Sequence, residues 1–156
     1  MPSLAASGRN QLSHNQRVQE KRPLCILLVE DDKDSLSALS RLLKMSGHRA
    51  LPAGTAAEAL RLAAAERCDV VVSDVGLPDR SGLELMRELA DLYAVPGIAV
   101  SGYTDAADVR DCTQAGFSRH LKKPIDFKEL LRAVDELTRL GRGDQGTSAA
   151  RGSDPQ

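Results

Sequence analysis

The sequence predicts an α/β protein in which five parallel strands alternate with five helices that cover both faces of one sheet. Three observations support this fold class. Short, continuous apolar runs, such as residues 70–72, are typical of strands that are buried on both faces. Segments with apolar residues at helical spacing separate these runs. Polar residues, several of them acidic, follow the runs directly, which places them at the carboxyl ends of the strands.

Size and composition narrow the function classes. The chain has 156 residues, enough for one domain with a core of its own. Its formal net charge is −1, so no overall field favours nucleic acid or an anionic membrane. Aromatic residues make up 3% of the chain and Trp is absent, which argues against a stacking platform for bases or sugars. The core must therefore be built from Leu, Val, Ile and Ala.

The three cysteines, Cys25, Cys68 and Cys112, are widely spaced and include no C-x-x-C pair. We therefore expect neither a disulfide nor a zinc framework, and interpret each as a small buried hydrophobe. Residues 1–22 lack the continuous apolar segment of a signal peptide or a membrane span. These features predict a cytoplasmic protein without membrane contact.

The first predicted elements are a strand, a helix and a second strand. The apolar run over residues 24–29 predicts the first strand, and residues 48–52 form the short second one. Residues 35–45 show helical spacing, with Asp32 as an acid at the helix start and Gly47 as the stop. The inward face of this helix is expected to comprise Leu36, Leu39, Leu42 and Leu43.

The middle of the chain adds a second helix, a third strand and a third helix. Thr55 and Glu58 form a capping box that opens an Ala-rich helix. The third strand covers residues 69–73 and is followed by a turn rich in Pro, Gly and Ser. A new helical pattern begins at Leu83. The inward faces of the two helices comprise Ala59, Leu60 and Ala63, and then Leu83, Leu85, Met86 and Leu89.

The last part of the domain supplies two strands and two helices. Residues 96–100 predict the fourth strand, and residues 117–121 predict the fifth. A helix over residues 105–115, which Gly116 stops, joins them. Asp126 opens the fifth helix in a capping pattern. The inward residues of these two helices are Val109 and Cys112, and then Leu130, Leu131, Val134 and Leu137.

The two ends of the chain are interpreted as tails. Residues 1–23 are rich in polar side chains and are expected to form a flexible leader. Residues 141–156 are mostly Gly, Ser, Asp and Arg and are expected to be disordered. One folded domain, residues 24–140, lies between them. The last segment is too short for a helix-turn-helix with its own core, so we expect no direct binding to nucleic acid.

Asp74 stands at the end of the central, third strand. Ligands of open parallel sheets bind outside the carboxyl ends of the strands, so this carboxylate is presented to a site. The alternative is that Asp74 only caps the following turn, which is a common role for Asp. Taken alone, the two interpretations have about equal weight.

Reactive groups also follow the other strands. Glu30 and Asp31 follow the first strand, Ser101 the fourth and Lys123 the fifth. Carboxylates would hold a hard divalent cation such as Mg²⁺, which takes oxygen ligands. Lys123 and Ser101 would bind phosphoryl oxygens, and Asp74 would act as a nucleophile toward phosphorus. Each residue also has a structural explanation as a cap, turn or surface group, but four coincidences at four strand ends are improbable.

Four segments of the chain resemble the receiver domain of two-component response regulators. They are residues 28–32 (Leu-Val-Glu-Asp-Asp), 74–82 (Asp-Val-Gly-Leu-Pro-Asp-Arg-Ser-Gly), 100–103 (Val-Ser-Gly-Tyr) and 121–125 (Leu-Lys-Lys-Pro-Ile). The resemblance covers roughly residues 24–140, and the order and spacing of the segments are specific although each one alone is weak. It implies a CheY-like sheet with the flavodoxin-like strand order 2-1-3-4-5.

The resemblance implies a role for each acidic residue of the site. It makes Asp74 the phosphoacceptor and Asp31 a direct Mg²⁺ ligand. Glu30 would act on the ion through water. The backbone carbonyl of Gly76 would complete the coordination by the protein, together with Asp74 itself.

The resemblance also covers the remaining site positions. Ser101 takes the place of the switch hydroxyl and Lys123 that of the phosphate-binding lysine. Lys123 precedes Pro124, and the peptide bond at this place is often cis in the family. His120 stands where the family has its switch aromatic; an inward, pH-sensitive imidazole and a plain exposed His on an edge strand are both open, with more weight on the second. Tyr103 is expected to cover part of the phosphoryl site.

The function implied by the resemblance is a phosphorylatable switch rather than an enzyme. A phosphoryl group would pass to Asp74 from phosphohistidine on a sensor histidine kinase or phosphotransfer protein. Movement of Ser101 would then bias the face formed by the fourth helix, the fifth strand and the fifth helix. A downstream protein would bind this face, and phosphorylation would permit a homodimer through it.

Competing functions are less consistent with the residues. A phosphatase of the haloacid-dehalogenase type needs a second acid two residues after its nucleophile, where Gly76 stands. A nucleotide-binding flavodoxin-like protein needs a phosphate loop after the first strand, which is missing. A receiver-like interaction module that is never phosphorylated stays open. Whether the chain is a single-domain regulator or a receiver from a longer protein is open as well.

Overall fold

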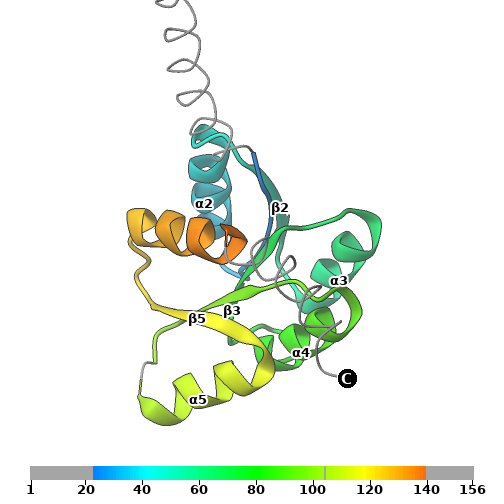
Figure 1. Cartoon of the computed structure of the whole chain (residues 1–156), viewed down its shortest axis with the longest axis vertical. Coiled ribbons are helices and arrows are strands. Elements are labelled where there is room, and N and C mark those ends of the chain that lie inside the picture. Colours follow the sequence, from blue (N-terminus) through cyan, green and yellow to red (C-terminus); the bar gives the residue numbers. More distant parts are fainter. Residues whose placement is uncertain (1–22, 104, 140–156) are drawn as a thin grey trace, which may run out of the picture.

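Five parallel strands form one sheet in the order β2-β1-β3-β4-β5, as predicted (Figure 1). The structure is a computed structural model, and it describes residues 23–103 and 105–139. All four neighbouring strand pairs run parallel, so each connection between consecutive strands is a crossover that contains a helix. The strand order changes direction between β1 and β3, which is the place where such sheets bind ligands.

The strands lie within one or two residues of their predicted positions. Their bounds are Cys25–Val29 (β1), Arg49–Ala53 (β2), Val70–Asp74 (β3), Gly97–Ser101 (β4) and Phe117–Lys122 (β5). The central strands β1, β3 and β4 are almost fully buried, because helices cover both of their faces. β2 is an edge strand and carries Pro52, a residue without a backbone N–H that suits an edge.

The helices begin at polar caps that the sequence pattern marks. Their bounds are Lys33–Met45 (α2), Ala56–Ala65 (α3), Gly82–Tyr93 (α4) and Ala106–Ala115 (α5), and residues 127–139 form the C-terminal helix. Four side chains cap the first four of these helices by accepting backbone hydrogen bonds: Asp32, Thr55, Ser81 and Asp105. The capping box at α3 is altered, because Glu58 accepts from the N–H of Gly54 at 2.7 Å rather than from that of Thr55.

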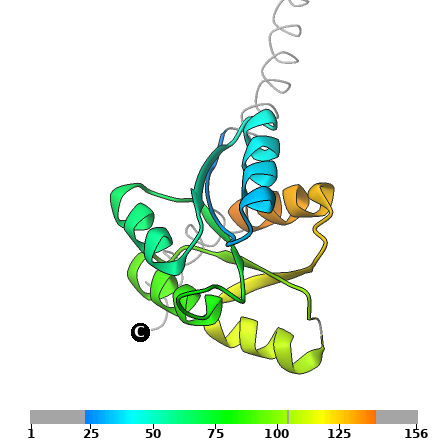
Figure 2. The same ribbon diagram turned by 180° about the vertical axis from the view of Figure 1, so that it is seen from behind.

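The sheet separates two apolar clusters. α3, α4 and α5 cover one face, and α2 and the C-terminal helix cover the other (Figures 1 and 2). The largest fully buried side chains of the first cluster are Leu27, Leu85, Met86 and Leu89, and those of the second are Ile26, Leu28, Leu43, Ile98 and Leu130. Alternation along β1 sends Leu27 to one cluster and Leu28 to the other, as expected for a strand buried on both faces.

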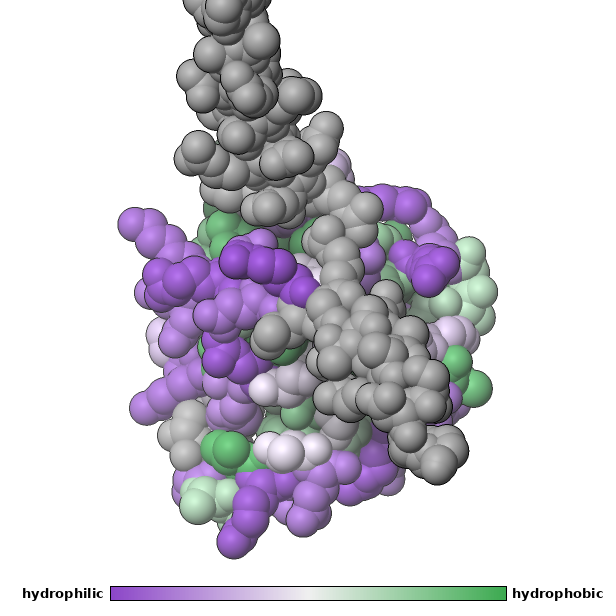
Figure 3. Space-filling view, in the orientation of Figure 1, coloured by the Kyte–Doolittle hydropathy of each residue, from purple (hydrophilic) through white to green (hydrophobic). Residues whose placement is uncertain are grey.

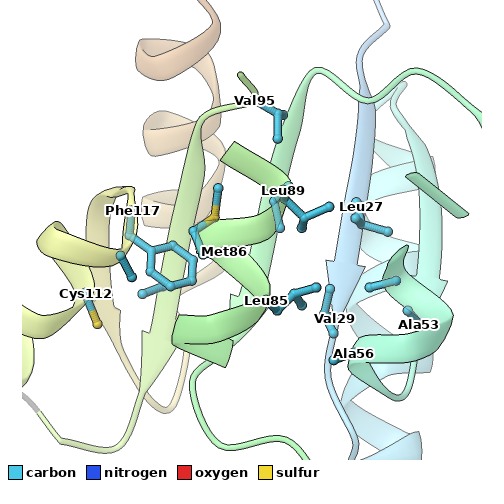
Figure 4. Packing of buried hydrophobic residues seen from close by; sticks show 14 of the residues in the cluster. Leu27, Val29, Ala53, Ala56, Leu85, Met86, Leu89, Val95, Cys112 and Phe117 are labelled. Atoms are coloured by element: carbon cyan, nitrogen blue, oxygen red, sulfur yellow. The ribbon is translucent and has the colours of Figure 1, made fainter. Parts of the chain in front are cut away.

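α4 packs closely against β4 at Gly97. A Cβ atom on Gly97 would overlap Sδ of Met86 and lie 3.0 Å from the ring of Phe117. Figure 4 shows Met86 of α4 and Phe117 of β5 side by side in this cluster. The absence of a side chain at Gly97 therefore lets a large thioether and an aromatic ring fill the space above the strand.

Two predicted inward residues are not in the core. Leu42 and Val109 are each 37% exposed, so both expectations were wrong. The inward stripe of α2 is narrower than the sequence suggested, with Leu43 buried and Leu36 and Leu39 partly buried. Because one helix packs on only part of its circumference, apolar residues next to that stripe stay at its edge.

The cysteines form no disulfide. Cys112 is buried, as predicted, whereas Cys25 and Cys68 are only half-buried. The face seen in Figure 3 carries mostly hydrophilic side chains, with hydrophobic ones in small separate areas. Within residues 23–103 and 105–139, none of the helices has the length and hydrophobicity needed to cross a membrane. The predicted leader, residues 1–23, lies outside the described residues except for Pro23, and the predicted tail, residues 141–156, lies wholly outside them.

Candidate functional site

The reactive groups predicted from the sequence come from the carboxyl ends of four strands. Asp74 and Ser101 are the last residues of β3 and β4, while Glu30 and Lys123 directly follow β1 and β5. The parallel pairing puts these positions level with one another: Val29 pairs with Ser73, and the last residues of β4 and β5 also pair. The sheet topology thus brings together residues from four distant parts of the chain.

Three carboxylates meet at this edge. Glu30, Asp31 and Asp74 each offer an oxygen, and these oxygens all lie within 4.8 Å of one another. The Glu30 side chain is buried, that of Asp74 is largely buried, and Asp31 is exposed. Carboxylate oxygens this close together, with one member open to solvent, suit Mg²⁺, which binds oxygen and keeps several of its waters. Repulsion among the three charges also requires a nearby cation.

Lys123 supplies one such cation. Its Nζ atom lies 2.9 Å from Oδ2 of Asp74 and 3.1 Å from Oε1 of Glu30. Partial burial acts to lower the pKa of Lys123, but hydrogen bonds and charge from Asp74 and Glu30 outweigh it and raise that pKa. The backbone N–H of Lys123 donates to the carbonyl of Ser101 at 2.9 Å, and the Lys123–Pro124 bond is cis, as the resemblance implied. The two neighbouring carboxylates thus hold Lys123 in its charged form.

The third acid after β1 has a different role. Asp32 caps α2, and one of its oxygens accepts from the N–H of Ser35 at 3.0 Å and from the Ser35 hydroxyl at 2.7 Å. These hydrogen bonds hold the pKa of Asp32 below its usual value. The N–H of Asp32 donates to Oε2 of Glu30 at 3.0 Å, which fixes Glu30 at the site. The interpretation of Asp32 as a helix-start acid is confirmed.

Gly76 lies in the β3–α4 loop, residues 75–81, beside the acidic cluster. Its N–H donates to Oδ1 of Asp74 at 3.2 Å, and its backbone forms an antiparallel bridge with Ser81. The N–H of Gly82 donates to the carbonyl of Val75 at 2.6 Å, and a Cβ on Gly82 would overlap the carbonyl oxygen of Asp74. The base of the loop is therefore closed tightly around Asp74.

Ser101 is buried at the end of β4, next to the cluster but engaged with its own loop. Its Oγ accepts a hydrogen bond of 3.0 Å from the N–H of Tyr103. A hydroxyl that accepts in this way keeps its own proton for donation. Tyr103 is 74% exposed, so its side chain projects mainly into solvent in this structure.

His120 is not the plain exposed residue that the sequence analysis favoured. It is half-buried in β5, opposite Ala99 of β4, and its Nε2 atom is buried. Among the described residues, Nε2 has no hydrogen-bond partner. The inward interpretation of the ring is therefore the better one for this structure.

Sequence reasoning did not single out Asp79. It looked like an ordinary residue of the Pro-containing turn after Asp74, where Asp is common. In the structure, its two carboxylate oxygens accept from the N–H groups of Ala56 and Ala57, each at 2.9 Å. The signal that was missed is that every helix start presents four N–H groups without a partner in the helix, two of which Asp79 binds at α3.

Comparison with known proteins agrees with this geometry. The sequence model of the "Response regulator receiver domain" family matches residues 26–135. The chain therefore belongs to the response regulator receiver family, whose members act as signalling switches of two-component systems.

Two relatives differ in how much of their length the match covers. The chain is 34% identical over 114 residues to the "Transcriptional regulatory protein KdpE" of Mycobacterium tuberculosis, a match that covers 73% of this chain and 50% of that one. The chain thus spans half the length of this curated relative. It is 37% identical over 114 residues to an "Uncharacterized 14.6 kDa protein" of Leptolyngbya boryana, covering 71% of this chain and 87% of that one.

Solved structures show the same fold. A CheY-like response regulator receiver domain from Methanospirillum hungatei superimposes with a TM-score of 0.74 at 27% identity, over 78% of this chain and 98% of that one. The signal receiver domain of an HD domain-containing protein from Pseudomonas fluorescens gives a TM-score of 0.72 at 30% identity, over 78% and 98% of the two chains. The predicted family and strand order are both confirmed.

Proposed function

We propose that this receiver accepts a phosphoryl group on Asp74 from a phosphohistidine donor. The observation that carries the proposal is the contact of Asp74 with Lys123 at 2.9 Å, inside a cluster of two further carboxylates. An Asp at a strand end, flanked by an ammonium and by a group of oxygens suited to Mg²⁺, has what phosphoryl transfer requires: charge compensation and fixed position.

The proposed transfer moves the phosphoryl group from a histidine nitrogen of the donor to a carboxylate oxygen of Asp74. A carboxylate oxygen of Asp74 forms a bond to phosphorus, the P–N bond to the donor imidazole breaks, and the imidazole nitrogen takes up a proton. Lys123 offsets negative charge on the transferred oxygens, and the proton of the Ser101 hydroxyl is available to another of them. Mg²⁺, when bound, would add positive charge at the same oxygens. Water would later cleave the acyl phosphate and restore the Asp74 carboxylate, so the phosphorylated state is temporary, as a signalling switch requires.

The metal would be held by residues already at the site. Asp31 is exposed and close to Asp74, so these two carboxylates are the direct ligands, together with the carbonyl of Gly76. The buried Glu30 would act through a water molecule, because Lys123 already contacts its Oε1. The assignment of the carboxylates rests on the distances between their oxygens, and that of the Gly76 carbonyl rests on the family resemblance.

The output would pass through the face formed by α5, β5 and the C-terminal helix. Ser101 ends β4, the strand next to β5, and His120 lies on β5 itself, so these two residues stand between the site and this face. Phosphorylation replaces the paired Asp74 charge with a group of about −1.5 to −2 charge, which draws the Ser101 hydroxyl and its loop inward. A downstream protein, or a second copy of the chain, is the proposed partner of this face.

The proposed setting is the cytoplasm, which the three free thiols suit. The domain arrangement that we favour is a single receiver over residues 24–140. What supports it is the Leptolyngbya relative, a 14.6 kDa protein of which the match covers 87%. A receiver that belongs to a longer protein, as in KdpE, is the other arrangement.

The test is the intact mass of the protein after incubation with acetyl phosphate, with and without Mg²⁺. We expect a Mg²⁺-dependent gain of one phosphoryl group that Asp74→Asn abolishes and that Asp91→Asn, an exposed control on α4, retains. If acetyl phosphate gives no gain, a phosphorylated histidine protein is the second donor. Failure with both donors would support the alternative, a receiver-like module that signals by binding alone.

A further inference from the structure

The β3–α4 loop holds one of the proposed metal ligands, the carbonyl of Gly76, and is attached to the fold at two places. The first is its base, where Gly76 bridges to Ser81 and Gly82 contacts Asp74. The second is its tip, where Asp79 contacts the start of α3. The base and the tip are attached to different elements, and α3 and α4 lie side by side on the same face of the sheet (Figures 1 and 2).

The contact at the tip is a bidentate one between a carboxylate and two backbone donors. Oδ1 of Asp79 accepts from the N–H of Ala56 at 2.9 Å, and Oδ2 accepts from the N–H of Ala57 at 2.9 Å. Thr55, the N-cap of α3, takes the next N–H, that of Glu58, at 3.1 Å. The first turn of α3 is therefore capped jointly by its own N-cap residue and by a loop that comes from the phosphoacceptor strand.

The N-terminus of α3 favours the negative charge of Asp79. The hydrogen bonds from Ala56 and Ala57 hold the pKa of the Asp79 carboxyl below its usual value. The positive end of the α3 dipole favours an anion at the same point. The other side of the tip is attached to α4, because the Arg80 guanidinium lies 3.1 Å from Glu88. The tip thus carries one charged anchor for each of the two helices beside it.

We propose that Asp79 is a positioning residue that keeps the β3–α4 loop docked, with the Gly76 carbonyl and Asp74 in the geometry that binds Mg²⁺. This inference rests on the proposed function of the site. Its physical basis is preorganisation: a loop that is docked only part of the time binds its ligand more weakly, in proportion to the docked fraction. The metal affinity should therefore depend on a side chain that does not itself contact the metal.

The experiment compares Asp79→Ala and Asp79→Asn with a control at the same helix end. Thr55→Ala also removes a cap from α3, but leaves in place both hydrogen bonds that α3 donates to Asp79. Three quantities are measured for each variant: the dissociation constant for Mg²⁺ by calorimetry, the backbone ¹⁵N order parameters of residues 75–81 without metal, and the phosphorylation rate from acetyl phosphate at saturating Mg²⁺.

Asp79→Ala should weaken Mg²⁺ binding about threefold to tenfold, below the usual effect of groups behind a metal ligand because Asp79 is exposed. The order parameters of residues 75–81 should fall, while the phosphorylation rate at saturating Mg²⁺ stays near that of the wild type. Asp79→Asn keeps one acceptor oxygen, so its Mg²⁺ affinity and loop order should lie between those of the wild type and those of Asp79→Ala. Thr55→Ala should lower the stability of the fold and leave both the Mg²⁺ affinity and the loop order unchanged.

Three results would contradict the inference in different ways. If the wild type binds Mg²⁺ and Asp79→Ala binds it equally tightly, the positioning role is wrong and the proposed function stands. If the wild type binds no Mg²⁺ and accepts no phosphoryl group, the proposed function is wrong, and the role of Asp79 at a metal site is lost with it. If Asp79→Ala and Thr55→Ala change the metal affinity equally, Asp79 acts only as a cap of α3 and has no separate positioning role.

Discussion

Lys123 and Asp74 form a hydrogen-bonded ion pair of 2.9 Å although they are 49 residues apart in the sequence. β4 lies between their strands, so the lysine side chain reaches across the end of β4 to the phosphoacceptor strand. The same ammonium contacts Glu30 of the first strand end. One cation therefore links three strand ends, and several consequences of that arrangement can be measured.

Replacing Lys123 with Ala should separate metal binding from phosphoryl transfer. The variant leaves three carboxylates without their cation, so Mg²⁺ should bind at least as tightly as in the wild type. Phosphorylation from acetyl phosphate should slow by about a hundredfold or more, because a preorganised positive group is missing at the transferred oxygens. Calorimetry and mass spectrometry measure the two effects. A variant that loses Mg²⁺ binding but keeps the transfer rate would reverse the assigned roles.

Asp31→Ala should remove Mg²⁺ binding while leaving the fold intact. Asp31 is exposed and accepts none of the side-chain or capping hydrogen bonds described for residues 23–103 and 105–139, so its loss should barely change the free energy of unfolding. The Mg²⁺ dissociation constant should rise by at least about tenfold. Asp34→Ala, at an exposed acid on α2, is the matched control. Mg²⁺ binding by Asp31→Ala at wild-type strength would show that Asp31 is not a ligand.

Gly97→Ala should destabilise the fold through overpacking. The new Cβ would overlap Met86 and press on the Phe117 ring, both of which lie in the packed cluster of Figure 4. We expect a loss of about 1–3 kcal/mol in the free energy of unfolding. Gly102→Ala is the control, since a Cβ there meets nothing within 4 Å. Urea unfolding of both variants gives the measurement, and equal stability of the two would contradict the packing argument.

Ala94→Gly should stabilise the protein. Ala94 caps the end of α4 with φ of +53°, a left-handed conformation that costs an L-residue about 1 kcal/mol and costs Gly little. A gain of about 0.5–1 kcal/mol is expected, which a thermal or urea unfolding curve resolves. Ala38→Gly, in the exposed interior of α2, should instead lose about 1 kcal/mol. A destabilised Ala94→Gly would mean that the Ala94 methyl group makes contacts worth more than the strain.

Cys68 should make the stability fall at alkaline pH. Burial raises the pKa of the Cys68 thiol from 9.0 to about 12. A group whose pKa is higher in the folded state stabilises the fold fully below the unfolded value and stops doing so as the pH rises toward the folded value. The free energy of unfolding should therefore decline above pH 9 by at most a few kcal/mol. Urea unfolding between pH 8 and 10.5 should show a smaller decline for Cys68→Ala, and an equal decline would exclude Cys68 as its source.

Much of the fold could be predicted from local patterns. Buried strands such as β3 consist of consecutive apolar residues, and helix starts such as Thr55 carry capping side chains, so both are recognisable from a few neighbouring positions. The order of the strands followed from the family resemblance rather than from periodicity. The inward placements of Leu42 and Val109 on their helices were wrong, because periodicity identifies the apolar stripe of a helix but not how much of it the neighbours cover.

The chemical content of the site was also visible before the structure. Acids at the end of the first and third strands and a lysine after the fifth can be read from the chain, and parallel strands bring their carboxyl ends to one edge. The structure places Glu30, Asp74 and Lys123 in mutual reach, as that argument required. His120 was harder, because whether a side chain on β5 points inward depends on the register and bulge of the strand pair.

Local patterns were enough to identify the elements and the residues that can react, because these depend on neighbours within a few positions of the chain. Which distant groups meet became visible only in the folded molecule. The attachment of Asp79 to Ala56 and Ala57 joins segments 22 and 23 residues apart, and the ion pair of Lys123 spans three strand ends. Such contacts depend on how helices and loops settle on the finished sheet, and hydrogen bonds between distant segments leave no periodic trace in the sequence.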